Sequence, residues 1–120
     1  MQQIRLMRGV LRLFRDTLAA EGIPFAVVII PTLEAVQDDA VFREAGIPPG
    51  LYLSNERIAE RLCREEGIPV LALQGVFLAH RGLGLYTPDD GHLSLAGTRL
   101  AARELARFAA NEGLLVAADE

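Results

Sequence analysis

The sequence holds a single cysteine, no lysine and only two serines among its 120 residues. Cys63 has no partner for an internal disulfide and no neighbour at metal-binding spacing, so we expect it as a buried filler on a helix. The 12 basic residues, all arginine, are mixed with 16 acidic residues to a net charge of -4. No basic stripe therefore indicates nucleic acid or an anionic membrane, and the expected partner is a small molecule or another protein.

Long hydrophobic runs are missing as well. No stretch of about 18 apolar residues is present, so we expect no membrane-spanning segment and no membrane partner. Arginines interrupt the apolar pattern near the N-terminus, which leaves no uninterrupted core for a signal peptide. The expected location is by default the cytoplasm, although a piece of a longer exported chain would have the same features.

Hydrophobic residues make up 51% of the chain, enough for a buried core, and the length suits one domain over residues 1–120. Residues 3–20 have the spacing of an amphipathic helix, which Glu21-Gly22 ends. Residues 25–30 are then apolar at every position. We expect the arginines of this helix to face solvent and five of its apolar residues to face the core, namely Ile4, Met7, Leu11, Phe14 and Leu18.

The same helix-then-strand unit occurs a second time. Ser54 is expected to cap a helix that ends at Glu66-Gly67, and the apolar run 68–73 follows. A short run of consecutive apolar, often β-branched residues is typical of a strand covered on both faces in a parallel sheet. The two units together predict an α/β fold with a doubly wound parallel sheet.

The remaining segments are less regular. Residues 33–45 and 75–81 are predicted to form short helices, and the prolines and glycines of 46–50 a loop. Ser94 is expected to cap a final helix over 95–111. The residues of that helix expected to face inward are Leu100, Ala101, Leu105, Phe108 and Ala109.

One stretch brings two carboxylates and an imidazole together, because Asp89, Asp90 and His92 lie just before the final helix. Loops beyond the carboxyl ends of parallel strands are where open α/β sheets carry their sites. An aspartate two or three residues upstream can fix the tautomer of the histidine, which leaves the other ring nitrogen free to move a proton. The alternative reading is an acidic turn followed by a surface histidine.

The segment Asp90-Gly91-His92-Leu93-Ser94, with Gly97 three residues later, resembles the last motif block of the SGNH (GDSL-type) hydrolases. These are α/β serine esterases and acyl- or acetyl-transfer enzymes. The two upstream helix–strand units also resemble that family, from about Leu11 to Phe108. The resemblance implies a three-layer, flavodoxin-like sheet of which this chain is the C-terminal part.

The same resemblance implies roles for individual residues. His92 would be the base that takes the proton of a serine nucleophile, and an aspartate would orient it. Some members place that aspartate three residues before the histidine, as Asp89, and others two before, as Asp90; the Asp-Gly-His form favours Asp90. The Gly-Asp-Ser nucleophile block and the oxyanion donors of the family are absent, and Ser54 and Ser94 are better explained as helix caps.

The other candidate functional residues have weaker support in the sequence. His80 next to Arg81 is expected to be a solvated loop pair, with substrate binding as the alternative. Asp38-Asp39 could bind a cation but has no third ligand at suitable spacing, so an exposed helix turn is preferred. The Asp89, Asp90 and His92 group also lacks a further metal ligand. We therefore predict no metal site and no cofactor.

Two functional hypotheses follow from the sequence. The first is the His and Asp half of a serine ester hydrolase or acyltransferase that acts on a small-molecule ester. The second is a non-catalytic α/β module that binds a protein partner through its sheet edge. In either case an uncovered strand edge predicts association with further copies of the chain.

Overall fold

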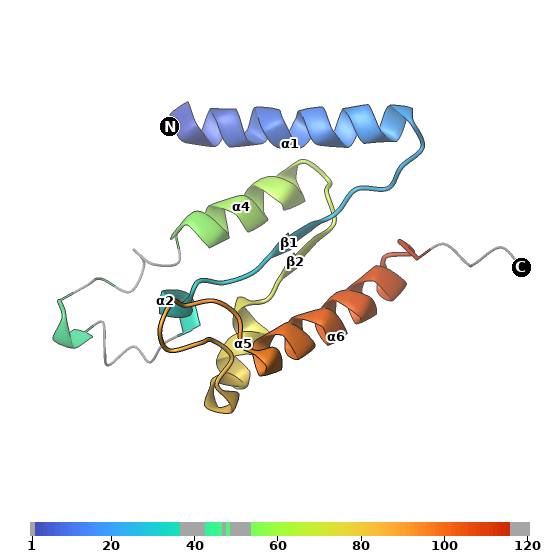
Figure 1. Ribbon diagram of the computed structural model, residues 1–120. Coiled ribbons are helices and arrows are strands. Elements are labelled where there is room, and N and C mark those ends of the chain that lie inside the picture. The colour runs from blue at the N-terminus through green and yellow to red at the C-terminus, as the bar shows by residue number, and fades with distance from the viewer. Residues whose placement is uncertain (1, 37–42, 47, 49–53, 116–120) are drawn as a thin grey trace, which may run out of the picture.

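The structure, a computed structural model, describes residues 2–36, 43–46, 48 and 54–115. No helix within these ranges has the length and apolar character needed to cross a membrane. Figure 1 shows the elements in chain order. They are α1 (Gln2–Ala20), β1 (Val27–Ile29), α2 (Leu33–Val36), α4 (Ser54–Glu65), β2 (Val70–Ala72), α5 (Gln74–Ala79), the 3-10 turn η1 (Arg81–Leu83) and α6 (Leu95–Asn111).

The predicted helix ends are confirmed at both Glu-Gly-Ile-Pro segments. Gly22 and Gly67 adopt φ of 69° and 68°, the left-handed conformation in which a side chain is unfavourable. The amide of the following isoleucine then reaches back into the last helical turn: Ile23 N donates to Leu18 O at 2.9 Å, and Ile68 N to Cys63 O at 2.8 Å. Each glycine therefore ends its helix in a Schellman motif and directs the chain into a strand.

The two apolar runs pair in parallel, as the sequence predicts. Val27, Val28 and Ile29 of β1 lie opposite Val70, Leu71 and Ala72 of β2. The ladder is shorter than the apolar runs: its flanking bonds are Val27 N to Pro69 O at 2.9 Å and Leu73 N to Ile29 O at 3.1 Å. Helix α4 lies on one side of the strand pair and α6 on the other (Figure 1), which confirms the α/β class.

The core lies at the carboxyl ends of the two strands. Phe77 and Leu73 are fully buried there, and Leu100 anchors the start of α6 against them. The remaining buried members of this cluster are Val36 and Leu85. Cys63 is buried within α4, as predicted, and burial raises the pKa of its thiol. Of the residues of α6 expected to face inward, Leu100 is buried and Ala101, Phe108 and Ala109 are half-buried, whereas Leu105 is 44% exposed.

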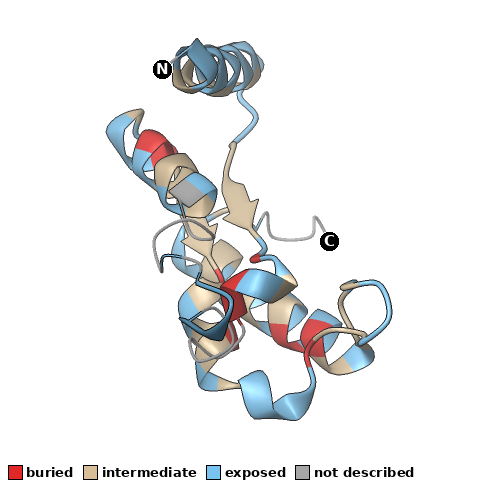
Figure 2. Ribbon diagram, turned by 90° about the vertical axis from the view of Figure 1, so that its left-hand side faces the viewer, coloured by how far each residue is buried: buried red, intermediate tan, exposed pale blue. Residues whose placement is uncertain are grey.

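Both strands have a helix on either side, but they are less buried than the sequence predicts for strands within a parallel sheet. All six strand residues are only half-buried, and Ile30, just after β1, is 51% exposed. The physical reason is that a two-stranded sheet gives β1 a neighbour along one edge only. Figure 2 shows β1 and β2 without buried residues, while buried residues occur in the helices and loops around them.

Helix α1 does not bury an apolar face as predicted. None of its residues is buried; Ile4, Leu11 and Leu18 are half-buried, whereas Met7 and Phe14 are 39% and 53% exposed. In Figure 2 α1 lies apart from the core, joined to it through the loop that leads into β1. Phe14 stacks on Phe25 of that loop, with ring centroids 5.8 Å apart.

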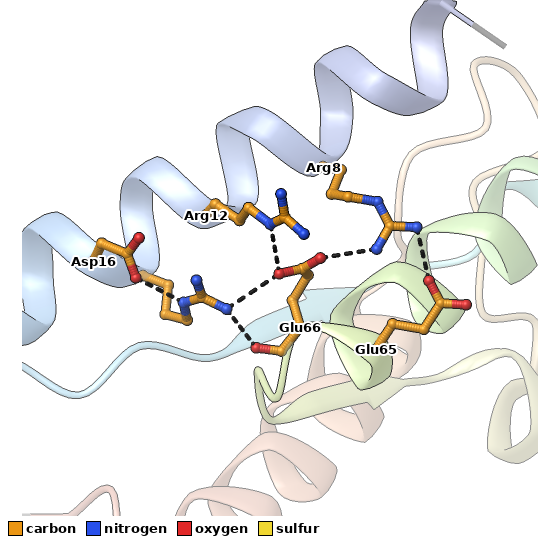
Figure 3. A network of polar contacts seen from close by, with 6 residues as sticks. Arg8, Arg12, Asp16, Glu65 and Glu66 are labelled. Atoms are coloured by element: carbon orange, nitrogen blue, oxygen red, sulfur yellow. Dashed lines mark hydrogen bonds and ion pairs between the residues drawn. The ribbon is translucent and has the colours of Figure 1, made fainter.

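The arginines of α1, expected in solvent, instead hold the helix to the end of α4 (Figure 3). Arg12 Nε lies 2.7 Å and Arg15 Nη1 3.2 Å from one oxygen of Glu66, and Arg8 Nη1 lies 2.8 Å from the other. The side chain of Glu66 is only 6% exposed. Hydrogen bonds from Arg12 and Arg8 lower the pKa of Glu66 to about 2. Charge, more than apolar packing, therefore sets the rotation of α1.

Four predictions fall partly or wholly outside the described residues. The helix predicted over 33–45 is observed as α2 at its start, and residues 37–42 are not described. Most of the loop predicted over 46–50 and both members of Asp38-Asp39 are likewise outside the described ranges. Helix α4 begins at Ser54 as expected, but the side chain of this residue is not described, so its capping role remains a prediction.

Candidate acid–base site

The site is a short loop closed by backbone hydrogen bonds. Tyr86 and Leu93 form an isolated antiparallel bridge at its base. Within it, Thr87 N donates to His92 O at 2.7 Å and Gly91 N donates to Thr87 O at 3.3 Å. Gly91 adopts a φ of 71°, which L side chains rarely reach and which turns the chain back toward the bridge. The loop between Tyr86 and Leu93 therefore has a defined backbone although its side chains lie near solvent.

Tyr86 fastens this loop to the end of β1. Its hydroxyl donates to the carbonyl oxygen of Pro31, and its ring contacts Phe77 edge to face at 6.0 Å between centroids. Burial, together with the negative charges of Glu56 and Glu34, raises the pKa of Tyr86 to about 12. The loop therefore lies beyond the carboxyl end of the sheet, as predicted for a site of an α/β fold.

The start of α6 closes the other side of the loop. The Ser94 hydroxyl accepts a hydrogen bond from Gly97 N at 3.1 Å and donates to Gly84 O at 2.6 Å. Both functions of the hydroxyl are thus engaged, which confirms Ser94 as a helix cap. Its hydrogen is directed at the backbone carbonyl of Gly84.

Gly97 is required by a close approach between α6 and the segment before the site. A β-carbon at this position would lie 2.1 Å from Leu85 O and 3.2 Å from the Leu93 side chain. The hydrogen bond from Ser94 N to Leu85 O, at 2.9 Å, holds the two segments at that distance. The glycine of the Asp-Gly-His-Leu-Ser-x-x-Gly pattern is thus explained by packing, because no side chain fits there.

The structure brings Asp90 to His92. Asp90 Oδ2 lies 2.9 Å from His92 Nδ1, and the other oxygen accepts from Thr87 Oγ1 and, at 3.2 Å, from His92 N. The Thr87 hydroxyl, followed by the side chain and backbone of His92, lowers the pKa of Asp90 to about 2. The carboxylate is therefore ionised at neutral pH, as needed to orient an imidazole and stabilise its protonated form.

Asp89, the alternative partner, is exposed, and no ion pair to His92 is found for it within the described residues. The contact with Asp90 leaves Nε2 of His92 as the ring nitrogen that faces away from the pair. The His92 side chain is 80% exposed, so Nε2 is open to a group brought from outside the loop. An imidazole held at Nδ1 with Nε2 open to solvent has the arrangement that general-base catalysis requires.

His80 differs from its expected place. It is half-buried at the C-terminal end of α5, where its Nδ1 lies 2.8 Å from Val76 O. That contact is a helix-end interaction, so the prediction of a solvated pair with Arg81 is wrong. Among the residues that the structure describes, no group of three His, Cys, Asp or Glu side chains is placed to hold a metal ion.

The contacts of Thr87 with Asp90 and of Tyr86 with Pro31 were not predicted from the sequence. The composition Thr87-Pro88-Asp89-Asp90-Gly91 is typical of a turn in which a hydroxyl side chain can bond to a nearby residue, and that signal was available. Tyr86 had no such signal, because its partner Pro31 is distant in sequence.

Residues 1–120 match the family described as "SGNH hydrolase-like domain, acetyltransferase AlgX". The chain belongs to this SGNH hydrolase-like family. The match covers the full length and confirms the family that the Asp90-Gly91-His92 pattern suggested. No significant similarity to a curated protein or to a solved structure is found.

Proposed function

We propose that this SGNH hydrolase-like chain supplies the acid–base half of an acyl-transfer site. His92 is the base and Asp90 its orienting acid. The observation that carries the proposal is the 2.9 Å contact between Asp90 Oδ2 and His92 Nδ1, on a loop beyond the carboxyl end of β1. The family description names an acetyltransferase, which favours an acetyl or other small acyl ester as the substrate.

The chemistry assigned to His92 is proton transfer in both directions. Nε2 takes the proton of a serine hydroxyl as the serine oxygen attacks the ester carbonyl, and the imidazolium is stabilised by the Asp90 carboxylate. The imidazolium then gives that proton to the oxygen of the departing alcohol. Water or an acceptor hydroxyl repeats the cycle on the acyl-serine, which releases an acid or a new ester.

The serine of this scheme comes from a polypeptide segment outside residues 1–120. Ser94 is engaged as a cap, and the chain has no Gly-Asp-Ser block. The exposed surface supports such a completion. Leu6 and Leu13 of α1 are 69% and 66% exposed, and an apolar hollow of about 320 Å³ is lined by Leu13, Phe14, Thr17 and Leu18. A further segment packed against α1 would cover this surface.

The test compares two neighbouring carboxylates. The coding sequence upstream of Met1 is read for an in-frame Gly-Asp-Ser block, and the longer polypeptide is assayed with p-nitrophenyl acetate. We expect Asp90→Asn and His92→Ala to lower kcat/KM by about 100-fold or more, while Asp89→Asn stays near wild type.

Residues 1–120 alone are expected to show no esterase activity that depends on His92 and no labelling by a fluorophosphonate probe. Labelling of Ser94 or Ser54 would contradict the claim that the nucleophile lies outside the chain. An equal loss on Asp89→Asn and Asp90→Asn would contradict the assigned pair.

A second function is favoured by a separate observation: among the described residues, β1 has a strand neighbour along one edge only. The strand pairs with β2 along one edge, and Ile30 beside it is 51% exposed. A strand of a partner protein, or of a second copy of this chain, can add to such an edge through backbone hydrogen bonds. In this case Ile30→Lys abolishes association of residues 1–120 with the partner, whereas Asp90→Asn leaves association unchanged. The acyl-transfer proposal instead predicts that Asp90→Asn lowers the esterase activity of the longer polypeptide.

A further inference from the structure

The Asp90 carboxylate is held by three donors, which is more than its pairing with His92 requires. Oδ2 faces Nδ1 of His92 at 2.9 Å. Oδ1 accepts from the Thr87 hydroxyl and, at 3.2 Å, from the backbone N–H of His92. The donor on the Thr87 side therefore fixes the rotation of the carboxylate about its Cβ–Cγ bond.

Thr87 is itself held in place from both sides. Its N–H donates to His92 O at 2.7 Å and its carbonyl accepts from Gly91 N at 3.3 Å. It follows Tyr86, whose hydroxyl is bonded to Pro31 O, and threonine is restricted in χ1 by its branched Cβ. The hydroxyl lies 3.2 Å from His92 O and closer to Asp90 Oδ1, so Asp90 is its main acceptor. The backbone that presents it is held by bonds that do not involve the carboxylate.

Because the Asp90–His92 pair is exposed, its geometry needs support from a donor such as the Thr87 hydroxyl. The side chains of His92 and Asp90 are 80% and 59% exposed, and an exposed ion pair alone gains little from being held in one geometry. A carboxylate free to rotate would offer Nδ1 a poorly aligned acceptor and would let water compete for it. The tautomer of the neutral imidazole would then no longer be set by Asp90.

We propose that Thr87 is the positioning residue of the acid–base pair: its hydroxyl locks the Asp90 carboxylate so that His92 carries its proton on Nδ1 and keeps Nε2 as the base. The proposal rests on the assignment of His92 as base. Thr87 does not touch the substrate; it acts only through Asp90.

Two substitutions separate the hydroxyl from the rest of the side chain. Thr87→Val keeps the branched shape and removes the donor, while Thr87→Ser keeps the donor. The ratio of Nδ1–H to Nε2–H tautomers of His92 is read from imidazole 15N shifts, and the Asp90 carboxyl is titrated by 13C NMR. We expect Thr87→Val to lower the tautomer ratio roughly threefold or more and to raise the Asp90 midpoint by about one unit.

Thr87→Ser is expected to restore both values, and Thr98→Val, at an exposed position of α6, to change neither. Unchanged NMR values in Thr87→Val overturn the proposal, as does an equal change in Thr87→Ser. If Thr87→Val disorders the loop, Thr87→Ser with wild-type values supports the proposal and Thr87→Ser with disturbed values overturns it. Because no readout is catalytic, failure of the acyl-transfer proposal would leave a distinct result, namely an intact pair without esterase activity in the longer polypeptide.

Discussion

Substitution of Gly97 by alanine tests the packing argument most directly. The added carbon would lie 2.1 Å from the Leu85 carbonyl oxygen, whereas real β-carbons essentially never approach closer than 3.0 Å. Because the opposing atom belongs to the backbone, no rotamer change relieves the contact. The first turn of α6 must therefore move away from Leu85 by roughly 1 Å, which also strains the bond from Gly97 N to Ser94 Oγ.

The expected loss follows from three opposing contributions. Overpacking costs about 2 kcal/mol and a weakened helix cap about 1 kcal/mol. Alanine in place of a helical glycine returns about 1 kcal/mol. We therefore expect Gly97→Ala to lower the free energy of unfolding by about 2 kcal/mol, which corresponds to roughly 10 °C in Tm for a domain of this size.

The assay is urea and thermal unfolding followed by far-UV circular dichroism, with Gly9→Ala as the matched control. Gly9 lies inside α1 and a β-carbon there meets nothing within 4 Å, so alanine should stabilise by up to about 1 kcal/mol. A Gly97→Ala variant as stable as wild type, measured beside a stabilised Gly9→Ala, would refute the packing argument.

Two further predictions concern the ion pairs that hold α1 and the tyrosine that anchors the site. Glu66 has a pKa lowered to about 2 from an ordinary value of 4.5, so the stability it contributes is present above pH 4.5 and is lost as the pH falls toward 2. Glu66→Gln should remove that acid dependence and expose α1 to limited proteolysis, whereas Glu21→Gln should do neither; proteolysis unchanged by Glu66→Gln would contradict the ion-pair account of α1. Tyr86→Phe should cost about 1 kcal/mol in urea unfolding through the lost bond to Pro31, and an absorbance titration of the wild type should show one tyrosine ionising near pH 12. Titration of both tyrosines near 10 would exclude the buried placement.

Local signals in the sequence were sufficient for most of the secondary structure. The helix ends at Gly22 and Gly67, the last helix from Leu95 to Asn111 and its cap at Ser94 are all observed where predicted. Each depends on residues within a few positions of one another, such as a glycine that can adopt positive φ or a hydroxyl that reaches the third amide of a helix. Such interactions are encoded locally and can be predicted without knowing the fold.

In the candidate site, too, only the contacts between residues close in sequence were predictable. The proximity of Asp90 and His92 follows from their spacing on a turn, and the pattern around them indicated the SGNH hydrolase-like family that the match confirms. The role of Gly97 was not predictable in physical terms, because the carbonyl of Leu85 that excludes a side chain is brought there by the fold. The anchoring of Tyr86 to Pro31 is of the same kind.

The two copies of Glu-Gly-Ile-Pro show which features the sequence alone cannot predict. As sequence they are identical, and both end a helix and start a strand. Yet Glu21 is exposed, while the Glu66 side chain is 6% exposed and receives three arginines of α1. The sequence by itself determined the turn, because the geometry of the turn depends on four consecutive residues. Only the tertiary structure decided which of the two carboxylates faces α1, because the arginines that bind Glu66 lie 51 to 58 residues before it in the chain.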